Sequence, residues 1–461
     1  MPLQETTAPL PADENGFLEP AGGTQKNASP KAGAGPLRIL AGRFGYVLCA
    51  QWGSSLLTGL FLILLARSGP ELFGFFTLAM ALGALVSLAT DAGLKDYLVP
   101  LFSEKGANMR RVLARAWCIQ AVLLLSSLAV LGLLCLPLGY GAQKSVVVLL
   151  VSAGIGLNTA IQSFFVLCRV RGRQDAEMRI AVPASRAGSL FGIGCLLLGA
   201  PPALLACFKL VESLVMAAFI GRALRWRLGG FPDGLRRWLG DWRQGSYFAG
   251  IAVCGLLYNK LNMYVLDRYG GSYSLGLYNA PWEIVDGISV LISGALLAKV
   301  LFPHLAGQWQ KDRPAFRRAC GLTAGGLLIF CLAASFVLFA AAEWMLTLVY
   351  GPEYLASVPL LNAQLPCLLF SSLHNLAAYM LISMQRYRPL LLAYAGGLAC
   401  NVVLCFLLIP EQGAVGAAWA ISGTKILMAV CTVGLALVLL REDQASRSGR
   451  STRSTFPSDA K

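Results

Sequence analysis

The sequence consists largely of apolar runs about 20 residues long, with basic clusters between them. A helix of that length spans the hydrocarbon core of a bilayer, about 30 Å thick, and satisfies its own backbone hydrogen bonds. Hydrophobic residues make up 56% of the 461 residues and charged residues only 13%, which excludes an ordinary soluble protein. The strand-length alternation of an outer-membrane barrel is not found in the sequence. We therefore predict an all-α, multi-pass integral membrane protein.

Twelve membrane segments are predicted between a Pro-, Gly- and Ala-rich tail at residues 1–37 and a Ser/Arg-rich tail at 441–461. The first tail has no apolar run, and we expect it to be disordered and cytoplasmic. The predicted segments cover residues 41–66, 72–99, 112–136, 145–168, 178–199, 202–221, 245–267, 274–300, 319–342, 355–384, 389–409 and 413–440.

The basic residues lie at the ends of the predicted helices on alternate sides, which is the positive-inside pattern. With the N-terminus in the cytoplasm, most cations fall on the inner side, whereas Arg67, Lys144 and Arg268 fall outside. Both termini are therefore predicted to be cytoplasmic. The net charge of +15 then reflects membrane topology, and we expect no nucleic-acid partner. The 13 cysteines show neither a CxxC pair nor metal-ligand spacing, so we expect no metal and no other cofactor.

The two halves of the chain resemble each other. Like residues recur roughly 200 positions apart around the first and fourth outer turns, and again one helix later. The corresponding pairs are Arg67 with Arg268, Gly74 with Gly276, Phe76 with Tyr278, and Pro100 with Pro303. Similarly, Lys209 of the sixth predicted helix corresponds to Lys425 of the twelfth. Because each half holds six helices, an even number, we predict parallel repeats related by a pseudo-twofold axis along the membrane normal. The predicted lobes cover 38–222 and 245–440, joined by a cytoplasmic linker at 223–244.

Charged residues inside apolar segments are the strongest functional signal, and they concentrate between Tyr258 and Pro303. A charge at the bilayer centre costs about 2.5 to 3.5 kcal/mol on insertion scales, so each must face water, a partner or a substrate. At about 1.5 Å per residue, Lys260 lies about 22 Å from the cytoplasmic start of its helix. Glu283 and Asp286 lie about 13 to 18 Å from the outer side, and Lys425 lies about 18 Å into its own helix. These charges are therefore predicted to meet at similar depth.

Several segments resemble the polysaccharide-transporter branch of the MOP exporter superfamily, which includes flippases for O-antigen and other lipid-linked oligosaccharides. The similarity extends over residues 38 to 440. The segments that carry it are TDAGLKDYLVP from Thr90, DRYGGSYSLGLYNA from Asp267, LFPHLAGQWQKD from Leu301, YGPEYLAS from Tyr350 and NVVLCFLLIPEQGAVGAAWA from Asn401.

This resemblance implies twelve transmembrane helices in two six-helix lobes, arranged as a V around a hydrated central cavity with alternating access. The first, second, seventh and eighth helices of such proteins line the cavity. It also implies a flippase in the bacterial cytoplasmic (inner) membrane, serving O-antigen, exopolysaccharide or other surface polysaccharide biosynthesis. The expected partners are a lipid-linked oligosaccharide, carried on undecaprenyl diphosphate, membrane lipids and the polysaccharide polymerase machinery.

A diphosphate-linked glycan needs cations for its phosphates and amide or hydroxyl groups for its sugars. Lys260, with Asn259 and Asn262 beside it, is our main candidate for phosphate binding; the alternative is a structural ion pair with Glu283 or Asp286. For Lys425, exposure to the cavity and pairing between the two lobes both stay open. Arg186 and Gln51 complete the substrate-binding candidates, although Arg186 is near enough to a helix end to extend to the interface.

Pairs of nearby charges suggest coupling or gating as well as simple neutralisation. Glu283 and Asp286 share a helix face, so either they form a proton or Na⁺ coupling site or they balance Lys260. Asp91 and Lys95, four residues apart, form either a self-satisfied pair or a cytoplasmic gate. Lys209 and Glu212, three apart on one face, are predicted to form a structural ion pair.

Two other functions compete with the flippase. A drug/cation antiporter of the same superfamily would need a mainly acidic, aromatic-walled cavity, whereas this sequence supplies several cations to the membrane interior. A non-transporting scaffold of a glycan assembly complex is the second alternative. We do not expect an enzyme, since no acid/base pair accompanies a nucleotide or metal motif and no GxxxxGK[ST] loop is found.

Overall fold

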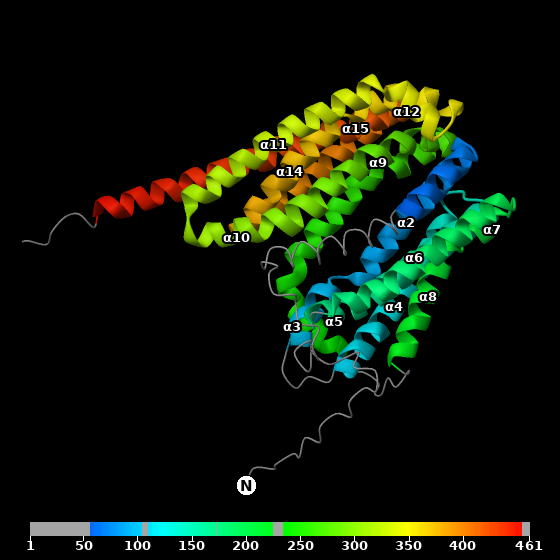
Figure 1. The fold of residues 1–461 in the computed structure, drawn as a ribbon, viewed down its shortest axis with the longest axis horizontal. Helices are drawn as coiled ribbons and strands as arrows, with labels where there is room; N and C mark the ends of the chain where they lie inside the picture. The colour runs from blue at the N-terminus through cyan, green and yellow to red at the C-terminus, as the bar shows by residue number, and fades with distance from the viewer. Residues whose placement is uncertain (1–55, 104–108, 172, 225–233, 454–461) are drawn as a thin grey trace, which may run out of the picture. The chain divides into compact units, whose positions relative to one another are not determined.

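The computed structural model describes residues 56–103, 109–171, 173–224 and 234–453, and these form helices and short connections only (Figure 1). The predicted N-terminal tail at 1–37, most of the predicted first segment and Gln51 lie outside the described residues. The prediction of an all-helical membrane protein is confirmed for the part of the chain that the structure describes.

The first half of the described chain contains one short apolar helix and seven labelled ones. They are Leu56–Arg67, α2 Pro70–Asp91, α3 Leu94–Ser103, α4 Met109–Cys135, α5 Ala142–Val170, α6 Gln174–Leu197, α7 Pro202–Leu205 and α8 Phe208–Leu224. The second half contains α-helices with one π-helix (η1) and one 3₁₀-helix (η2). They are α9 Gly234–Val290, η1 Leu291–Leu301, α10 Phe302–Lys311, α11 Arg313–Ala340, α12 Ala342–Val349, η2 Pro352–Ser357, α13 Val358–Gln364, α14 Pro366–Ser383 and α15 Tyr387–Arg453.

Nine helices of the described chain are long and apolar enough to cross a membrane, and two of these are folded back on themselves. The apolar parts of α9 and α15 contain 49 and 56 residues, more than twice what a bilayer of about 30 Å accommodates at about 1.5 Å per residue. Each consists of two helices joined at a glycine with non-helical backbone angles, Gly271 (φ 70°) and Gly413 (φ 57°). Positive φ is readily available only to glycine, so these residues permit the two turns. The total of twelve segments stays a prediction.

Two predicted segments are interrupted. The segment predicted at 72–99 divides into α2 and α3 because Ala92 and Gly93 adopt positive φ angles of 41° and 79°. The segment predicted at 355–384 divides into η2, α13 and α14. Pro366 begins α14, where the missing N–H of proline is tolerated at a first helical turn.

The chain separates into two compact units. The N-terminal unit contains the described residues up to Leu62 together with Leu82–Gly245, and the C-terminal unit contains Ile63–Ala81 together with the residues from Ser246 onward. In the N-terminal unit α5 packs against α3, α4 and α8, and in the C-terminal unit α14 packs against α11 and α15 (Figure 1). The predicted lobe boundaries and the pseudo-twofold axis stay predictions.

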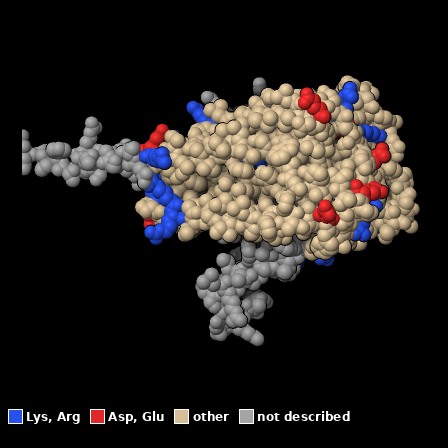
Figure 2. Space-filling model, turned by 90° about the horizontal axis from the view of Figure 1, so that it is seen from above, with Lys and Arg blue, Asp and Glu red and all other residues tan. Residues whose placement is uncertain are grey.

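Large apolar side chains on α4 and α11 are exposed, as a lipid-facing surface requires. Leu125, Ile329 and Phe336 are 68%, 72% and 72% exposed. On the face shown in Figure 2, the Lys, Arg, Asp and Glu side chains gather at the two ends, with a broad, nearly uncharged band between them. A band of this kind suits a bilayer core, and the chain is a multi-pass integral membrane protein.

Candidate functional site

An open polar cavity of about 320 Å³ is lined by α9, η1, α14 and α15 of the C-terminal unit. Both arms of α9 line it, because the turn at Gly271 brings the second arm back beside the first. The side chains with polar atoms in its wall are Tyr258, Asn259, Asp286, Ser289, Ser293, Ser371, Asn375, Tyr394 and Lys425. Hydroxyl, amide, phenol and charged groups therefore meet within a helical unit whose outer surface is apolar.

Lys425 is the buried cation of this cavity and is 5% exposed. Its Nζ donates hydrogen bonds to Asn259 Oδ1 at 2.7 Å and to Tyr258 Oη at 3.3 Å, and lies 4.7 Å from the centroid of the Tyr258 ring. Both bonding partners are neutral and both belong to the C-terminal unit. Asp286 lines the same cavity, but among the described residues no carboxylate oxygen lies within 4 Å of this Nζ.

Lys260 follows Asn259 directly on α9 and is half-buried. A step of one residue turns the side chain about 100° around the helix, and Lys260 is not part of the cavity wall. Glu283 interacts electrostatically with both Lys260 and Asp286. Glu283 therefore connects the two groups of charges electrostatically, and of the three α9 residues only Asp286 lines the cavity together with Lys425.

Asn262 lies between the two arms of α9 and is fully buried. Its Nδ2 donates to Tyr278 Oη on the second arm, and Tyr278 is also fully buried. The structure therefore places Asn262 as a link between the arms, away from the cavity wall where its proximity to Lys260 had suggested it would lie.

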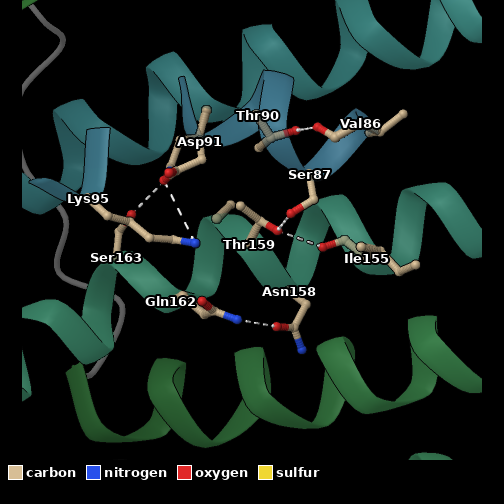
Figure 3. Close-up of polar contacts among 12 residues, drawn as sticks. Val86, Ser87, Thr90, Asp91, Lys95, Ile155, Asn158, Thr159, Gln162 and Ser163 are labelled. Atoms are coloured by element: carbon tan, nitrogen blue, oxygen red, sulfur yellow. Dashed lines mark hydrogen bonds and ion pairs between the residues drawn. The ribbon is translucent and has the colours of Figure 1, made fainter. Parts of the chain in front are cut away.

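Polar residues between α2, α3 and α5 of the N-terminal unit form a local cluster. Lys95 and Asp91 lie on either side of the break at Ala92 and Gly93, with 3.8 Å between Nζ and Oδ1 (Figure 3). Beneath them Ser87 and Thr159 share a hydrogen bond of 2.6 Å between α2 and α5. The spacing predicted a pair within one continuous helix, whereas the pair in fact bridges two helices.

A second charge pair lies on α8. Lys209 Nζ donates to Glu212 Oε2 at 2.7 Å, and Asn158 Nδ2 of α5 reaches the other oxygen of this carboxylate at 3.4 Å. Gln162 Nε2 in turn donates to Asn158 Oδ1 at 3.0 Å, as Figure 3 shows. Through Asn158 and Glu212 a chain of hydrogen bonds connects α5 to α8. Arg186 on α6 is exposed, and the structure brings it to neither polar cluster.

Gly74 of α2 and Gly276 of α9, which the predicted repeat pairs, lie at one close helix crossing within the C-terminal unit. A Cβ atom on Gly74 would lie 1.9 Å from Ser272 O, and one on Gly276 would lie 1.8 Å from Pro70 O. No side chain fits at either position, so the two backbones touch. One turn further on, Asn279 Nδ2 donates to Thr77 Oγ1 at 2.6 Å, between two buried side chains.

Arg67, which lies just before α2, forms hydrogen bonds with the end of α12. Its Nε donates to Val349 O at 2.8 Å and its Nη2 donates to Leu348 O, which satisfies carbonyl groups at the C-terminal end of α12. The buried Tyr354 hydroxyl donates to Ala66 O at 3.0 Å. Burial raises the pKa of Tyr354, so its hydroxyl stays a donor at neutral pH. The residue pairing of the internal repeat was the sequence signal that pointed to this region.

The sequence matches the model of a known protein family. A family model described as polysaccharide biosynthesis protein matches residues 64–359, which is most of the chain. The chain belongs to this family. A search of curated proteins gave no significant match.

Solved structures of MOP superfamily transporters share the fold. The lipid II flippase MurJ in an inward closed conformation superposes with a TM-score of 0.67 at 14% identity, covering 89% of this chain and 93% of MurJ. A multidrug resistance MATE family transporter of the MOP superfamily, inward-facing, gives a TM-score of 0.62 at 15% identity, covering 84% and 95%. A MOP superfamily transporter from Pyrococcus furiosus, noted for the reverse polarity of its binding pocket, gives 0.56 at 15%, covering 86% and 93%. The resemblance read from the sequence motifs is thereby confirmed at the level of family and fold.

Proposed function

We propose that the protein is a flippase that moves a lipid-linked oligosaccharide across the cytoplasmic membrane by alternating access, for surface polysaccharide biosynthesis. The observation that carries this proposal is the polar cavity around Lys425, lined by membrane helices of the C-terminal unit. A polar chamber inside the bilayer is costly to maintain and marks a substrate pathway in membrane proteins. Membership of the polysaccharide biosynthesis family indicates what kind of substrate to expect.

The chemistry of the cavity suits a sugar better than a drug cation. Amide and hydroxyl groups replace the hydration of sugar hydroxyls, and the wall supplies both through Asn259, Asn375, Ser289 and Ser371. A cationic drug would meet the ammonium group of Lys425, so this cavity disfavours the antiporter alternative.

Lys260, half-buried beside the cavity residue Asn259, is our candidate for the diphosphate of the carrier lipid. Because Lys260 lies on a different face of α9 from the cavity residue Asn259, the phosphates and the sugars would bind at different places. In this scheme Glu283, which lies within electrostatic range of Lys260, is either its counter-charge when substrate is absent or part of an ion-coupling site.

The membrane potential is a sufficient energy source in principle. For each negative charge moved outward through the full field, a potential of 100 mV contributes about 2.3 kcal/mol. A diphosphate carrier would therefore be driven outward without nucleotide hydrolysis. For the outer side, we propose that the crossing at Gly74 and Gly276 closes access while the inner side is open.

Deletion in the native host tests the proposed function. The expected result is a lipid-linked oligosaccharide that accumulates on the inner leaflet and is identified chemically after extraction. Unchanged polymer output with no accumulated intermediate would refute a flippase role. Lys260→Ala compared with Lys260→Arg tests the phosphate site, and full transport by both variants would exclude it.

A further inference from the structure

Lys209 and Lys425, which the predicted repeat pairs, differ in how their charge is balanced. Lys209 has a carboxylate three residues later, and Glu212 holds it at 2.7 Å. Three residues after Lys425 the chain has Met428, which is 1% exposed. Lys425 therefore lacks the acid three residues later that balances the charge of Lys209.

The two neutral partners of Lys425 leave part of its bonding capacity unused. An ammonium group carries three N–H donors, and Asn259 and Tyr258 accept two hydrogen bonds. Asp286 lines the same cavity and interacts electrostatically with Lys425, but within the described chain no carboxylate oxygen lies within 4 Å of its Nζ, so no acid forms a direct ion pair with it. A buried ammonium group without an adjacent anion is a costly arrangement, and a bound anion would relieve it.

The cavity has room for a small ligand. Its volume of about 320 Å³ is at the lower end of the range for small-molecule sites, about 300–1,000 Å³. Besides Lys425 its wall presents one carboxylate (Asp286), the hydroxyls of Ser289 and Ser371, and the amide of Asn375. Carboxylate and amide groups accept hydrogen bonds from sugar hydroxyls, and an ammonium group binds a carboxylate.

We propose that this cavity binds an acidic sugar, a pyranose that bears a carboxylate, as one unit of the transported glycan. The sugar carboxylate pairs with the ammonium group of Lys425, and the sugar hydroxyls donate to Asp286 and Asn375. Phosphate is the poorer fit, because a phosphate monoester carries a charge of about −1.5 to −2 and would face the Asp286 carboxylate in the same small space. This inference rests on the proposed function and adds the class of sugar.

A charge substitution in the repeat tests the proposal. Met428→Glu gives Lys425 the carboxylate at the spacing that Glu212 provides for Lys209, and Met428→Gln is the neutral control of equal size. Binding is measured on the full-length, detergent-solubilised protein as the ligand-dependent rise in unfolding temperature. The probes are methyl glucuronoside, methyl glucoside and inorganic diphosphate.

We expect methyl glucuronoside to stabilise the parent and Met428→Gln, and methyl glucoside to bind about ten- to a hundredfold more weakly. Met428→Glu should lose the response to the glucuronoside. Lys425→Met, which removes the charge without adding an acid, should lose it too, and this second variant keeps the test valid if Met428→Glu does not fold. A response to diphosphate in place of the glucuronoside, or an unchanged response in Met428→Glu, would overturn the proposal.

The deletion experiment separates this inference from the proposed function. If the accumulated lipid-linked oligosaccharide contains a uronic acid or another carboxylate sugar, both stand. If it contains only neutral sugars, the acidic-sugar site is wrong while the flippase role stands. If no lipid-linked oligosaccharide accumulates, the flippase role fails independently of the binding measurements.

Discussion

Substituting Gly276 by alanine tests the close crossing between α2 and α9. The new methyl carbon would lie 1.8 Å from Pro70 O, whereas real Cβ contacts essentially never fall below 3.0 Å, so the backbones must separate by more than 1 Å. The Asn279–Thr77 hydrogen bond of 2.6 Å, one turn away, would then lengthen or break. Overpacking of this kind costs about 1–3 kcal/mol. A change of that size shifts a two-state equilibrium about 5- to 150-fold, here away from the closed crossing.

The assay is the labelling rate of a cysteine that replaces Thr77, which is 2% exposed in the closed crossing. A membrane-impermeant maleimide, added from outside, should label Thr77→Cys slowly in the parent and at least several times faster with Gly276→Ala. Gly287→Ala is the matched control, since it lies on the same arm of α9 and its Cβ would meet no atom within 4 Å. Equal rates for Gly276→Ala and the parent would refute the reasoning, and so would equal acceleration by Gly287→Ala.

Three further predictions follow from the contacts of the two units. Glu212→Gln leaves Lys209 unpaired and should lower the unfolding temperature in detergent, with a cost near the lower end of the about 3–5 kcal/mol typical of buried pairs; Lys209→Met/Glu212→Met should recover most of it. Arg67→Ala removes two bonds to α12 carbonyls and should speed amide exchange in residues 342–357, leaving α4 unchanged, and unaltered exchange would show that Arg67 does not hold this end. Burial raises the pKa of Tyr354 above its usual value near 10, so its neutral hydroxyl contributes fully to stability below pH 10 and loses that contribution as the pH rises further. The loss of stability at alkaline pH should therefore be smaller in Tyr354→Phe than in the parent. Identical pH profiles for the two proteins would contradict this.

Features that depend on local sequence were predictable. Apolar length defines a membrane helix because the bilayer thickness is constant, and glycine marks the turns at Gly271 and Gly413 because only that residue readily takes positive φ. The ion pair of Lys209 and Glu212 has the spacing that places two side chains on one helix face. The break at Ala92 was less evident, because alanine favours helix and only the following Gly93 indicates an interruption.

Features that depend on how helices rotate against one another were not predictable. Counting residues gives the depth of Lys425 in the membrane, but the neighbour it meets at that depth depends on how α15 packs against α9. For the same reason Ser371, Asn375 and Tyr394 of the cavity wall carried no signal of their own in the sequence. Asn262 was expected to line the cavity because it lies three residues from Asn259. It instead donates a hydrogen bond to Tyr278 on the second arm of α9, and the sequence does not show that this arm lies there.

The predicted repeat allows a comparison that a single position does not. Lys209 has Glu212 three residues later, whereas Lys425 has the buried Met428 at the same spacing. We therefore predict that the pair in the N-terminal unit serves folding and that Lys425 serves a ligand. Glu212→Met should therefore impair folding. Met428 is buried against Gly397, so the effect of Met428→Glu is compared with that of Met428→Gln, which places a neutral group of equal size at the same position. Loss of the glucuronoside response in Met428→Glu alone would assign the loss to the added charge. An equal response in Met428→Glu and the parent would mean that Asn259 and Tyr258 already satisfy the lysine and that no anion is needed in the cavity.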